Sequence, residues 1–313
     1  MRALILRRLF TAIPTLLLVL LASFALMRFA PGGPFDGERP LAPETRAALE
    51  ASYGLDLPMG EQFWLFLTRT LTGDFGPSLV YRDFTVTQLI ADSLPVSLTL
   101  GGLAIVLALA LGLAAGMVAA LRPGGWADET LMLAATIVTA LPSFVTGPLL
   151  ALIFGLWLGL LPVGGLGDGS GDSLISAPQF WVLPVIALAL PVAGAIAKLA
   201  RAGLAAALAQ EHIRTARARG CSMRVIITRH ALRPALVPVV SYLGPAAAGL
   251  LTGAVVIETV FALPGLGRYF VQGALNRDYP LIMAVILLYA ALIIAFNLAA
   301  DLLYGWLDPR SRI

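Results

Sequence analysis

The hydrophobic positions of this chain gather into long runs separated by short polar stretches. A helix needs about 20 residues to cross a bilayer core roughly 30 Å thick, and six runs reach that length. They lie at residues 9–30, 96–121, 131–158, 181–200, 236–260 and 281–303. The pattern predicts an all-α membrane protein with six transmembrane helices.

The third run belongs to a longer apolar stretch, from Leu131 to Pro162, that exceeds one straight span. Dividing it into two spans would leave no loop and no polar turn between them. We therefore expect one long helix kinked at Pro142 and Pro148, with neighbouring helices satisfying the freed backbone groups.

The first run has an alternative interpretation as a secretory signal, because residues 23–25 (SFA) resemble a cleavage site. However, the run is long enough to span a membrane, and Arg28 follows the supposed site closely. We favour a membrane span. Under either interpretation the segment that follows is exported.

Charge between the runs predicts the orientation of the chain. Three arginines lie within the first eight residues, whereas residues 31–95 carry four basic and nine acidic residues. Residues 198–233 hold eight basic residues against one acidic residue, and the glycine-rich stretch 164–173 holds Asp168 and Asp172 with no basic residue. Because positive charge is retained on the cytoplasmic side, 31–95 and 164–173 are expected outside and 198–233 inside, with both termini cytoplasmic.

Four parts of the chain follow from this topology. Residues 1–30 form the N-terminus and first span, 31–95 an external segment, 96–303 the remaining five spans with a cytoplasmic loop at 201–235, and 304–313 a cytoplasmic tail. The external segment contains an amphipathic helical pattern in PETRAALEASYG and aromatic residues at 63, 64 and 66, which indicate a small folded cap.

Composition agrees with a lipid-facing surface. The chain is 59% hydrophobic and 12% charged, against about 25% charged residues in a typical soluble domain. Its net charge of +3 lies in short segments between spans without interleaved aromatic residues, which indicates membrane topology and not nucleic-acid binding. The single cysteine, Cys221, excludes an internal disulfide, and His230 lies among arginines, so we expect no metal site.

One internal loop carries more charge than topology requires. Residues 215–238 contain five arginines and a histidine between apolar runs, where two or three arginines would set the orientation. Residues 203–219 favour a helix that Gly220 can end with a positive φ, and a second helical stretch at 222–233 runs towards Pro234 and Pro238. Such a structured element along the membrane face suits docking to a partner.

The motifs of this loop resemble a known family. RTARARG followed by RHALRPALVPV resembles the EAA loop of binding-protein-dependent ABC importer permeases of the dipeptide and oligopeptide branch. The likeness continues through the N-terminal RRLFTAIP run, GDFGPS at 73–78, residues 256–280 and residues 297–310. GERPL at 37–41 resembles the first, B-type membrane subunit of the oligopeptide importer in particular.

The resemblance implies the type I importer permease fold, in which the helix before the glycine is a coupling helix that docks onto the cytoplasmic ATPase. Small alanines would allow close approach, and arginines could pair with carboxylates of the partner. His212 and Cys221 stand where the family usually has an aromatic residue and leucine. The implied docking residues are Glu211, Arg214, Thr215, Ala216, Arg217, Ala218, Arg219 and Gly220.

The same resemblance implies the partners. They are a second, C-type permease subunit, which could be a homologue or an identical copy, two ABC ATPase subunits that use ATP and Mg, and an external peptide-binding protein, all at a bacterial inner membrane. The chain has no P-loop, since its one lysine lies in PVAGAIAKLA, and it shows no hydrolase motif. We therefore expect a transport subunit that binds no cofactor and is not an enzyme.

Alternative functions differ in cargo or class. A sister system could carry nickel, glutathione or other small cargo in place of peptides. A secondary transporter would need ionisable residues in mid-span and usually an inverted repeat, and neither is evident beyond Glu258 and Asp301. A membrane hydrolase would need a nucleophile and a base, and no such motif appears.

Polar residues within the spans have structural and functional interpretations. Glu258 could line a gate or fix the turn before PGLG, and we favour the turn. Asn297 and Asp301, one helical turn apart, are expected to join helices. Gly112 and Gly116 form a small-residue packing pair. After the last span, Asp308 and Arg310 are candidates to tie the tail to the cytoplasmic loop.

Overall fold

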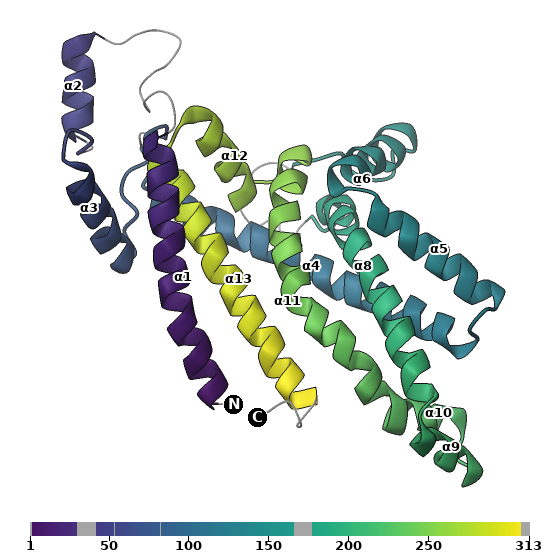
Figure 1. Ribbon diagram of the computed structural model, residues 1–313. Coiled ribbons are helices and arrows are strands. Elements are labelled where there is room, and N and C mark those ends of the chain that lie inside the picture. The colour runs from purple at the N-terminus through teal and green to yellow at the C-terminus, as the bar shows by residue number, and fades with distance from the viewer. Residues whose placement is uncertain (1, 30–41, 53, 82, 166–176, 308–313) are drawn as a thin grey trace. The chain divides into compact units, whose positions relative to one another are not determined.

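The computed structural model describes residues 2–29, 42–52, 54–81, 83–165 and 177–307, and this part of the chain is almost entirely helical (Figure 1). A single isolated bridge joins Pro77 and Thr85. The helices are α1 (Arg2–Phe29), α2 (Pro43–Ser52), α3 (Met59–Leu71), α4 (Val86–Leu121), α5 (Trp126–Ala140), α6 (Ser143–Leu150), the π-helix η1 (Ala151–Trp157), α8 (Gln179–Leu208), α9 (Glu211–Ala218), α10 (Met223–Val225), the π-helix η2 (Ile226–Ala231), α11 (Leu232–Val260), α12 (Leu266–Asn276) and α13 (Tyr279–Leu307).

Each predicted apolar run coincides with a helix. Five continuous helices are long and apolar enough to cross a membrane, and the third run supplies a sixth candidate as a bent pair. The continuous candidates are Ile5–Phe29, Val86–Leu121, Gln179–Leu208, Met223–Val260 and Tyr279–Leu307. The all-α membrane fold predicted from the sequence is confirmed.

The bend in the third run is sharper than a proline kink. α5 and the α6–η1 helix meet at 103°, with the break at Leu141 and Pro142. Leu141 adopts an extended conformation (ψ 118°) because the ring of a following proline disfavours helical geometry, and Pro142 itself cannot donate a backbone hydrogen bond. Pro148, by contrast, lies inside α6. The predicted single kinked helix is therefore two helices, and only Pro142 lies at the break.

The chain divides into two compact units. Unit 1 comprises residues 1–6, 97–263 and 293–313, and unit 2 comprises residues 7–96 and 264–292. Unit 2 thus joins the segment predicted to be external with α12 and the first half of α13. The two units are described separately below.

Helix α8 is the centre of unit 1. In its most apolar window 67% of residues are buried, and it packs against α5, α6 and α11. Gly112 and Gly116 of α4 lie against the α8 backbone, where an added Cβ at Gly112 would come within 2.7 Å of the Ala193 carbonyl oxygen. The predicted role of this glycine pair in close helix packing is confirmed, because any larger residue would force α4 and α8 apart.

Unit 2 holds the folded part of the predicted external segment. Phe66 of α3 is buried with Leu20 of α1 and Tyr279 of α13, and Phe63 makes an edge-to-face contact with Phe24 at 5.4 Å between ring centroids. Trp64, on the opposite side of α3, is exposed. The expected amphipathic helix is present as α2. Because α3 packs against α1 and α13, this segment is more than a linker.

Several residues named in the sequence analysis lie outside the described residues. They are the GERPL stretch at 37–41, Asp168 and Asp172, and the tail residues Asp308 and Arg310.

Candidate functional site

The coupling element predicted from the sequence is a separate short helix, α9, at the foot of α8 (Figure 1). A single helix over 203–219 was expected, but α8 ends at Leu208 and α9 begins at Glu211. Gln210 between them is extended, with φ −72° and ψ 153°. This break turns the chain so that the apolar side of α9 meets the end of α8, which a straight helix could not achieve.

Two residues fix α9 to unit 1. Ile213 and Ala216, three positions apart on one face of the helix, are 0% and 7% exposed. They pack with Leu204 and Ala207 of α8 in a cluster that also holds Ala120, Ile226, Ala231 and Ala235. Ala216 was expected at the docking surface but faces this interior cluster instead.

The remaining predicted docking residues point outward. All seven are exposed: Glu211, Arg214, Thr215, Arg217, Ala218, Arg219 and Gly220. Glu211 and Arg214 approach within 3.9 Å on the surface, which contributes little because both side chains are solvated. The helix therefore exposes two arginines, Arg214 and Arg217, with Arg219 exposed at its C-cap, while its apolar face is buried.

Gly220 ends α9 as the sequence predicts, with φ +80°. The Cys221 amide donates to the Ala216 carbonyl at 3.2 Å, and the Gly220 amide donates to the Arg217 carbonyl at 2.9 Å. This pair of bonds is a Schellman motif, which requires a left-handed residue at the glycine position and is strained for residues with a side chain. The orientation of α9 therefore depends on Gly220.

The second helical stretch is present but is not separate from span five. α10, η2 and α11 form one continuous helix from Met223 to Val260. Pro234 was expected to mark a boundary before the span, but it lies in the first turn of α11, directly after the π-helical stretch. A local π adjustment shifts the hydrogen-bond register, which lets a helix accept a proline without breaking.

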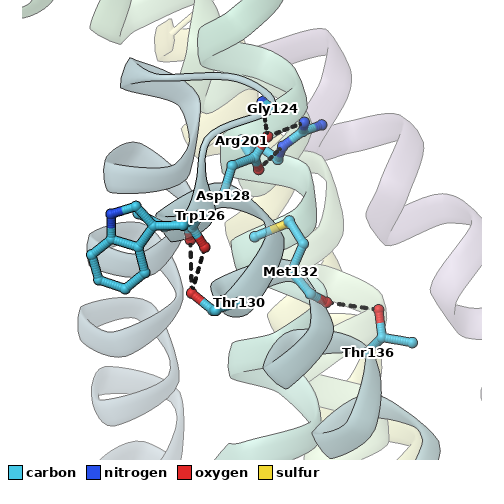
Figure 2. Close-up of polar contacts among 8 residues, drawn as sticks. Gly124, Trp126, Asp128, Thr130, Met132, Thr136 and Arg201 are labelled. Atoms are coloured by element: carbon cyan, nitrogen blue, oxygen red, sulfur yellow. Dashed lines mark hydrogen bonds and ion pairs between the residues drawn. The ribbon is translucent and has the colours of Figure 1, made fainter.

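An ion pair near α9, between a buried aspartate and a partly exposed arginine, was missed by the sequence analysis. Asp128, in the first turn of α5, is 3% exposed and accepts two hydrogen bonds from the Arg201 guanidinium of α8, 2.5 Å from Nε and 2.6 Å from Nη2. Figure 2 shows Arg201 and the Gly124 amide converging on this carboxylate, with the amide at 2.9 Å. From the sequence, Arg201 counted only as one of eight basic residues that set topology.

Arg233 joins the start of α11 to the end of α13. Its guanidinium donates to the carbonyl oxygens of Leu307 and Trp306 at 2.8 and 2.9 Å. These carbonyls belong to the last turn of α13, where the helix dipole also stabilises a positive charge. A tie between the C-terminal end and this loop was expected from Asp308 and Arg310, and within the described residues Arg233 supplies one.

Glu258 is completely buried in α11 and accepts a hydrogen bond from the Ser97 hydroxyl of α4 at 2.6 Å. The next residues turn sharply: the Leu263 amide donates to the Glu258 carbonyl at 2.8 Å, and Ala262 has φ +50°. Ser97 also lines an apolar cavity of about 220 Å³ with residues of α11 and α13. These contacts favour the structural interpretation of Glu258.

Asn297 lies where α13 meets α11. Its Nδ2 donates to the Ile293 carbonyl at 2.9 Å, and its Oδ1 lies against Gly244, which has no room for a side chain. Asp301 is half-buried one turn later. The position of Asn297 fits the expected role in joining helices.

Unit 2 contains a second polar contact that the sequence analysis missed. Ser78, the last residue of the GDFGPS motif, and Asp278, which precedes α13, are both buried. Their side chains are hydrogen-bonded to each other. Ser78 Oγ also accepts from the Tyr81 amide at 2.8 Å, and Asp278 caps α13 through the Leu281 amide at 3.3 Å. The motif thus fixes its own loop to the start of α13. An aspartate before a helix was the only local signal.

Within the described ranges, no group of three or more His, Cys, Asp or Glu side chains could hold a metal ion. His212 and His230 are both exposed.

Comparison with known proteins gives the family of this arrangement. Residues 112–313, which include α9 and both partners of the Asp128–Arg201 pair, match the family described as binding-protein-dependent transport system inner membrane component. The chain belongs to this family. The match covers the whole of the α9 cluster and extends to the end of the chain.

Individual members of this permease family are similar over nearly the whole chain. The chain is 47% identical to the oligopeptide transport system permease protein OppB of Escherichia coli (strain K12), over 98% of both proteins. It is 46% identical to OppB of Haemophilus influenzae over the same shares, and 39% identical to the dipeptide transport system permease protein DppB of Bacillus subtilis, over 98% of this chain and 97% of that protein. The likeness therefore includes residues before 112, where α3 and the Ser78 loop lie.

Proposed function

We propose that this permease forms one half of the translocation path of an ATP-driven oligopeptide importer, and that α9 is the surface on which a cytoplasmic ATPase docks. The observation that carries the proposal is the construction of α9. Its apolar residues anchor it to α8, its arginines face outward, and a glycine-dependent turn fixes its direction. When a partner displaces a helix held in this way, the membrane-spanning helices packed against it are displaced as well.

The proposed assembly has four kinds of partner. They are a second, C-type permease subunit, two ABC ATPase subunits that bind and hydrolyse ATP with Mg, an external binding protein that delivers peptide, and membrane lipid. The family description supports the binding protein, because its members belong to binding-protein-dependent transport systems. In this assembly the chain is a transport subunit, and ATP hydrolysis belongs to its partners.

Oligopeptides are the favoured cargo. The OppB relatives are 46–47% identical to this chain, whereas the DppB relative of Bacillus subtilis is 39% identical. Dipeptides are the second candidate, followed by nickel, glutathione or other small cargo of sister systems. Uptake of labelled peptides of two to six residues into vesicles that contain the whole complex tests the choice. Uptake limited to dipeptides, or inhibited by nickel or glutathione and not by longer peptides, would contradict the oligopeptide assignment.

Docking is tested by co-purification. The complex isolated through a tag on this permease should contain the ATPase subunits, and reversing the charge of Arg214, Arg217 and Arg219 together should remove them. The matched control reverses Arg122, Arg224 and Arg229, which are also exposed but lie outside α9, and it leaves the Arg233 contact intact. Retention of the ATPase by the α9 variant would argue against docking at this helix.

We also propose the topology from charge: a multi-pass inner-membrane protein with both termini cytoplasmic, residues 31–95 external, and 201–235 cytoplasmic. Asp83 and Ser222 are both exposed, so each can carry a labelling cysteine in a Cys221→Ser background. A membrane-impermeant thiol reagent should label Asp83→Cys in intact cells and Ser222→Cys only in inverted vesicles. Labelling of both from the outside would contradict the orientation.

A further inference from the structure

The part of unit 1 that carries α9 also contains the Asp128–Arg201 ion pair, which lies outside the proposed docking helix. Both carboxylate oxygens of Asp128 are engaged, one by Arg201 Nε and the other by Arg201 Nη2 and the Gly124 amide. Bidentate pairing of this kind is strong and geometrically specific, and it fixes the two side chains in one relative orientation. The pair therefore holds the start of α5 at one position along α8.

The burial of Asp128 distinguishes it from ordinary surface charges. Asp128 is 3% exposed, whereas Glu129, the next residue, is exposed and faces away. Arg201 is partly exposed, with 36% of its side chain accessible, so only Asp128 would be left as a buried, uncompensated charge if its partner were removed. Removing either partner abolishes the fixed geometry.

The ion pair is connected directly to the base of α9. Arg201 lies one helical turn before Leu204, which packs against Ile213 and Ala216 of α9. At the same level Gly116 of α4 lies against the backbone of Ala197 and Arg201. Contacts therefore link the end of α4, the start of α5, the end of α8 and the buried face of α9.

Helix α5 also leads away from this base to the region of Glu258. After the break at Leu141–Pro142 the chain continues as α6, where an added Cβ at Gly147 would lie 3.1 Å from Ile257 Cδ1 of α11. Ile257 is fully buried and precedes Glu258. A displacement of α5 would thus be transmitted through α6 to the end of α11.

We propose that Asp128 and Arg201 are positioning residues that make α5 move together with α8 and α9 when the ATPase displaces α9. Gly194 of α8 packs tightly against Ala135 and Thr139 further along α5, so the two helices stay in contact without the pair. The start of α5, however, is then no longer fixed to α8, and less of the displacement reaches α6 and α11. The proposal rests on docking of the ATPase at α9, which is the function proposed above.

The test uses the complete complex in vesicles, with peptide-loaded binding protein, and measures three quantities: ATPase subunits retained, ATP hydrolysed and peptide taken up. Asp128→Asn keeps the shape of the side chain and removes its charge. We expect uptake to fall at least about tenfold, in line with the loss of charge-assisted hydrogen bonds, while ATPase retention and hydrolysis persist. The ratio of ATP hydrolysed to peptide transported should rise accordingly. Glu129→Gln, the adjacent exposed carboxyl, should leave all three quantities unchanged.

Two further variants distinguish a loss of coupling from a simple folding defect. Arg201→Lys keeps the charge but cannot bind both carboxylate oxygens in the guanidinium geometry, so it should also raise the ratio, by a smaller factor. Asp128→Glu keeps a carboxylate that can accept from both Arg201 and the Gly124 amide, so it should retain more uptake than Asp128→Asn. A proportional loss of uptake and hydrolysis in Asp128→Asn and Arg201→Lys would mean a merely structural role and would overturn the proposal.

Failure of this proposal and failure of α9 docking give different results. If Gly220→Val abolishes uptake but Asp128→Asn transports normally, docking at α9 stands and the role of the ion pair is wrong. If Gly220→Val transports normally, the docking proposal itself fails, and with it the basis for this inference.

Discussion

The two short helices α9 and α3 both lie outside the apolar spans, and each is anchored by one apolar face, but they differ in what the other face offers. α9 buries Ile213 and Ala216 and exposes Arg214 and Arg217, with Arg219 exposed at its C-cap. α3 buries Phe66 and Gln62, and Gln62 donates to the carbonyl oxygens of Leu55 and Leu57 at 3.0 and 2.6 Å. Gln62 of α3 thus stabilises its own unit, whereas the arginines of α9 are exposed, as the proposed docking surface requires.

The difference predicts that α3 matters mainly for the stability of the fold and α9 mainly for ATP-driven transport. A helix whose polar groups are satisfied within its own unit contributes mainly to stability. A helix that is short, anchored by two residues and ended by a glycine with positive φ contributes little to stability, but its direction is fixed. Substitutions in α9 should therefore change transport without changing abundance, and substitutions in α3 should do the reverse.

The largest effect on transport is expected from Gly220→Val. Valine at φ +80° costs about 1–2 kcal/mol of strain, so the Schellman turn opens and α9 changes direction. An added Cβ at Gly220 meets no atom of this chain within 4 Å, so the loss is one of backbone geometry. ATP-driven peptide uptake should collapse while membrane abundance stays near normal.

The matched control for this change is Gly249→Val in α11, where the added Cβ also meets nothing within 4 Å and φ is not positive. It should leave abundance and ATPase co-purification near normal. Normal uptake by the Gly220→Val complex would mean that the arginine-rich loop is only a topological anchor.

The second effect, Phe66→Ala in α3, should appear in stability. Truncation of a buried phenylalanine costs about 3–5 kcal/mol, because transfer and cavity terms add. Abundance and the thermal midpoint of the purified complex should fall, while the ATP hydrolysed per peptide by the surviving complexes is unchanged. Trp64→Ala, on the exposed side of α3, should change neither quantity. A rise in ATP hydrolysed per peptide for Phe66→Ala would contradict the expectation that α3 affects stability alone.

Sequence reasoning predicted the spans and the glycine turn well, because both depend on local signals. Apolar runs of sufficient length and a glycine between two helical patterns can be read from one stretch of chain, and Gly220 has the expected positive φ. The division of 203–219 at Gln210 was not predictable in the same way. It depends on Ile213 and Ala216 folding back onto Leu204, a contact that periodicity alone does not reveal.

The buried polar pairs were missed for a related reason. Asp128 and Arg201 are 73 residues apart, and Ser78 and Asp278 are 200 residues apart. Nothing local identifies the partner of any of these residues, because each has an ordinary role in its own segment: Asp128 in a first helical turn, Arg201 within α8, Ser78 in a turn and Asp278 before a helix. Only the packing of α8 against α5, and of the GDFGPS loop against the start of α13, brings the partners together.

A third, smaller effect is expected from Ser78→Ala in unit 2. The change removes one donor to the buried Asp278 carboxylate and one acceptor for the Val80 and Tyr81 amides, which should cost about 1–3 kcal/mol. The thermal midpoint should fall less than in Phe66→Ala. Ser222→Ala removes a hydroxyl that caps no backbone amide and should leave the midpoint unchanged. Equal shifts for both serine variants would show that the buried contact contributes nothing specific.

The smallest effect should come from a single arginine of α9. Arg217 is exposed, so its pairing with a carboxylate of the ATPase would occur at a solvated rim, where one ion pair contributes about 0.2–1 kcal/mol. Arg217→Ala should therefore weaken ATPase retention only a few-fold. Because salt screens such contacts, the difference from the unchanged protein should shrink as ionic strength rises.

Arg229→Ala is the matched control, since it removes the same charge from an exposed position on η2, outside α9. Retention should be lower for Arg217→Ala than for Arg229→Ala at low salt and equal at high salt. If the two variants weaken retention equally at every salt concentration, the arginines act through the overall positive charge of the loop, and α9 is not a defined docking surface.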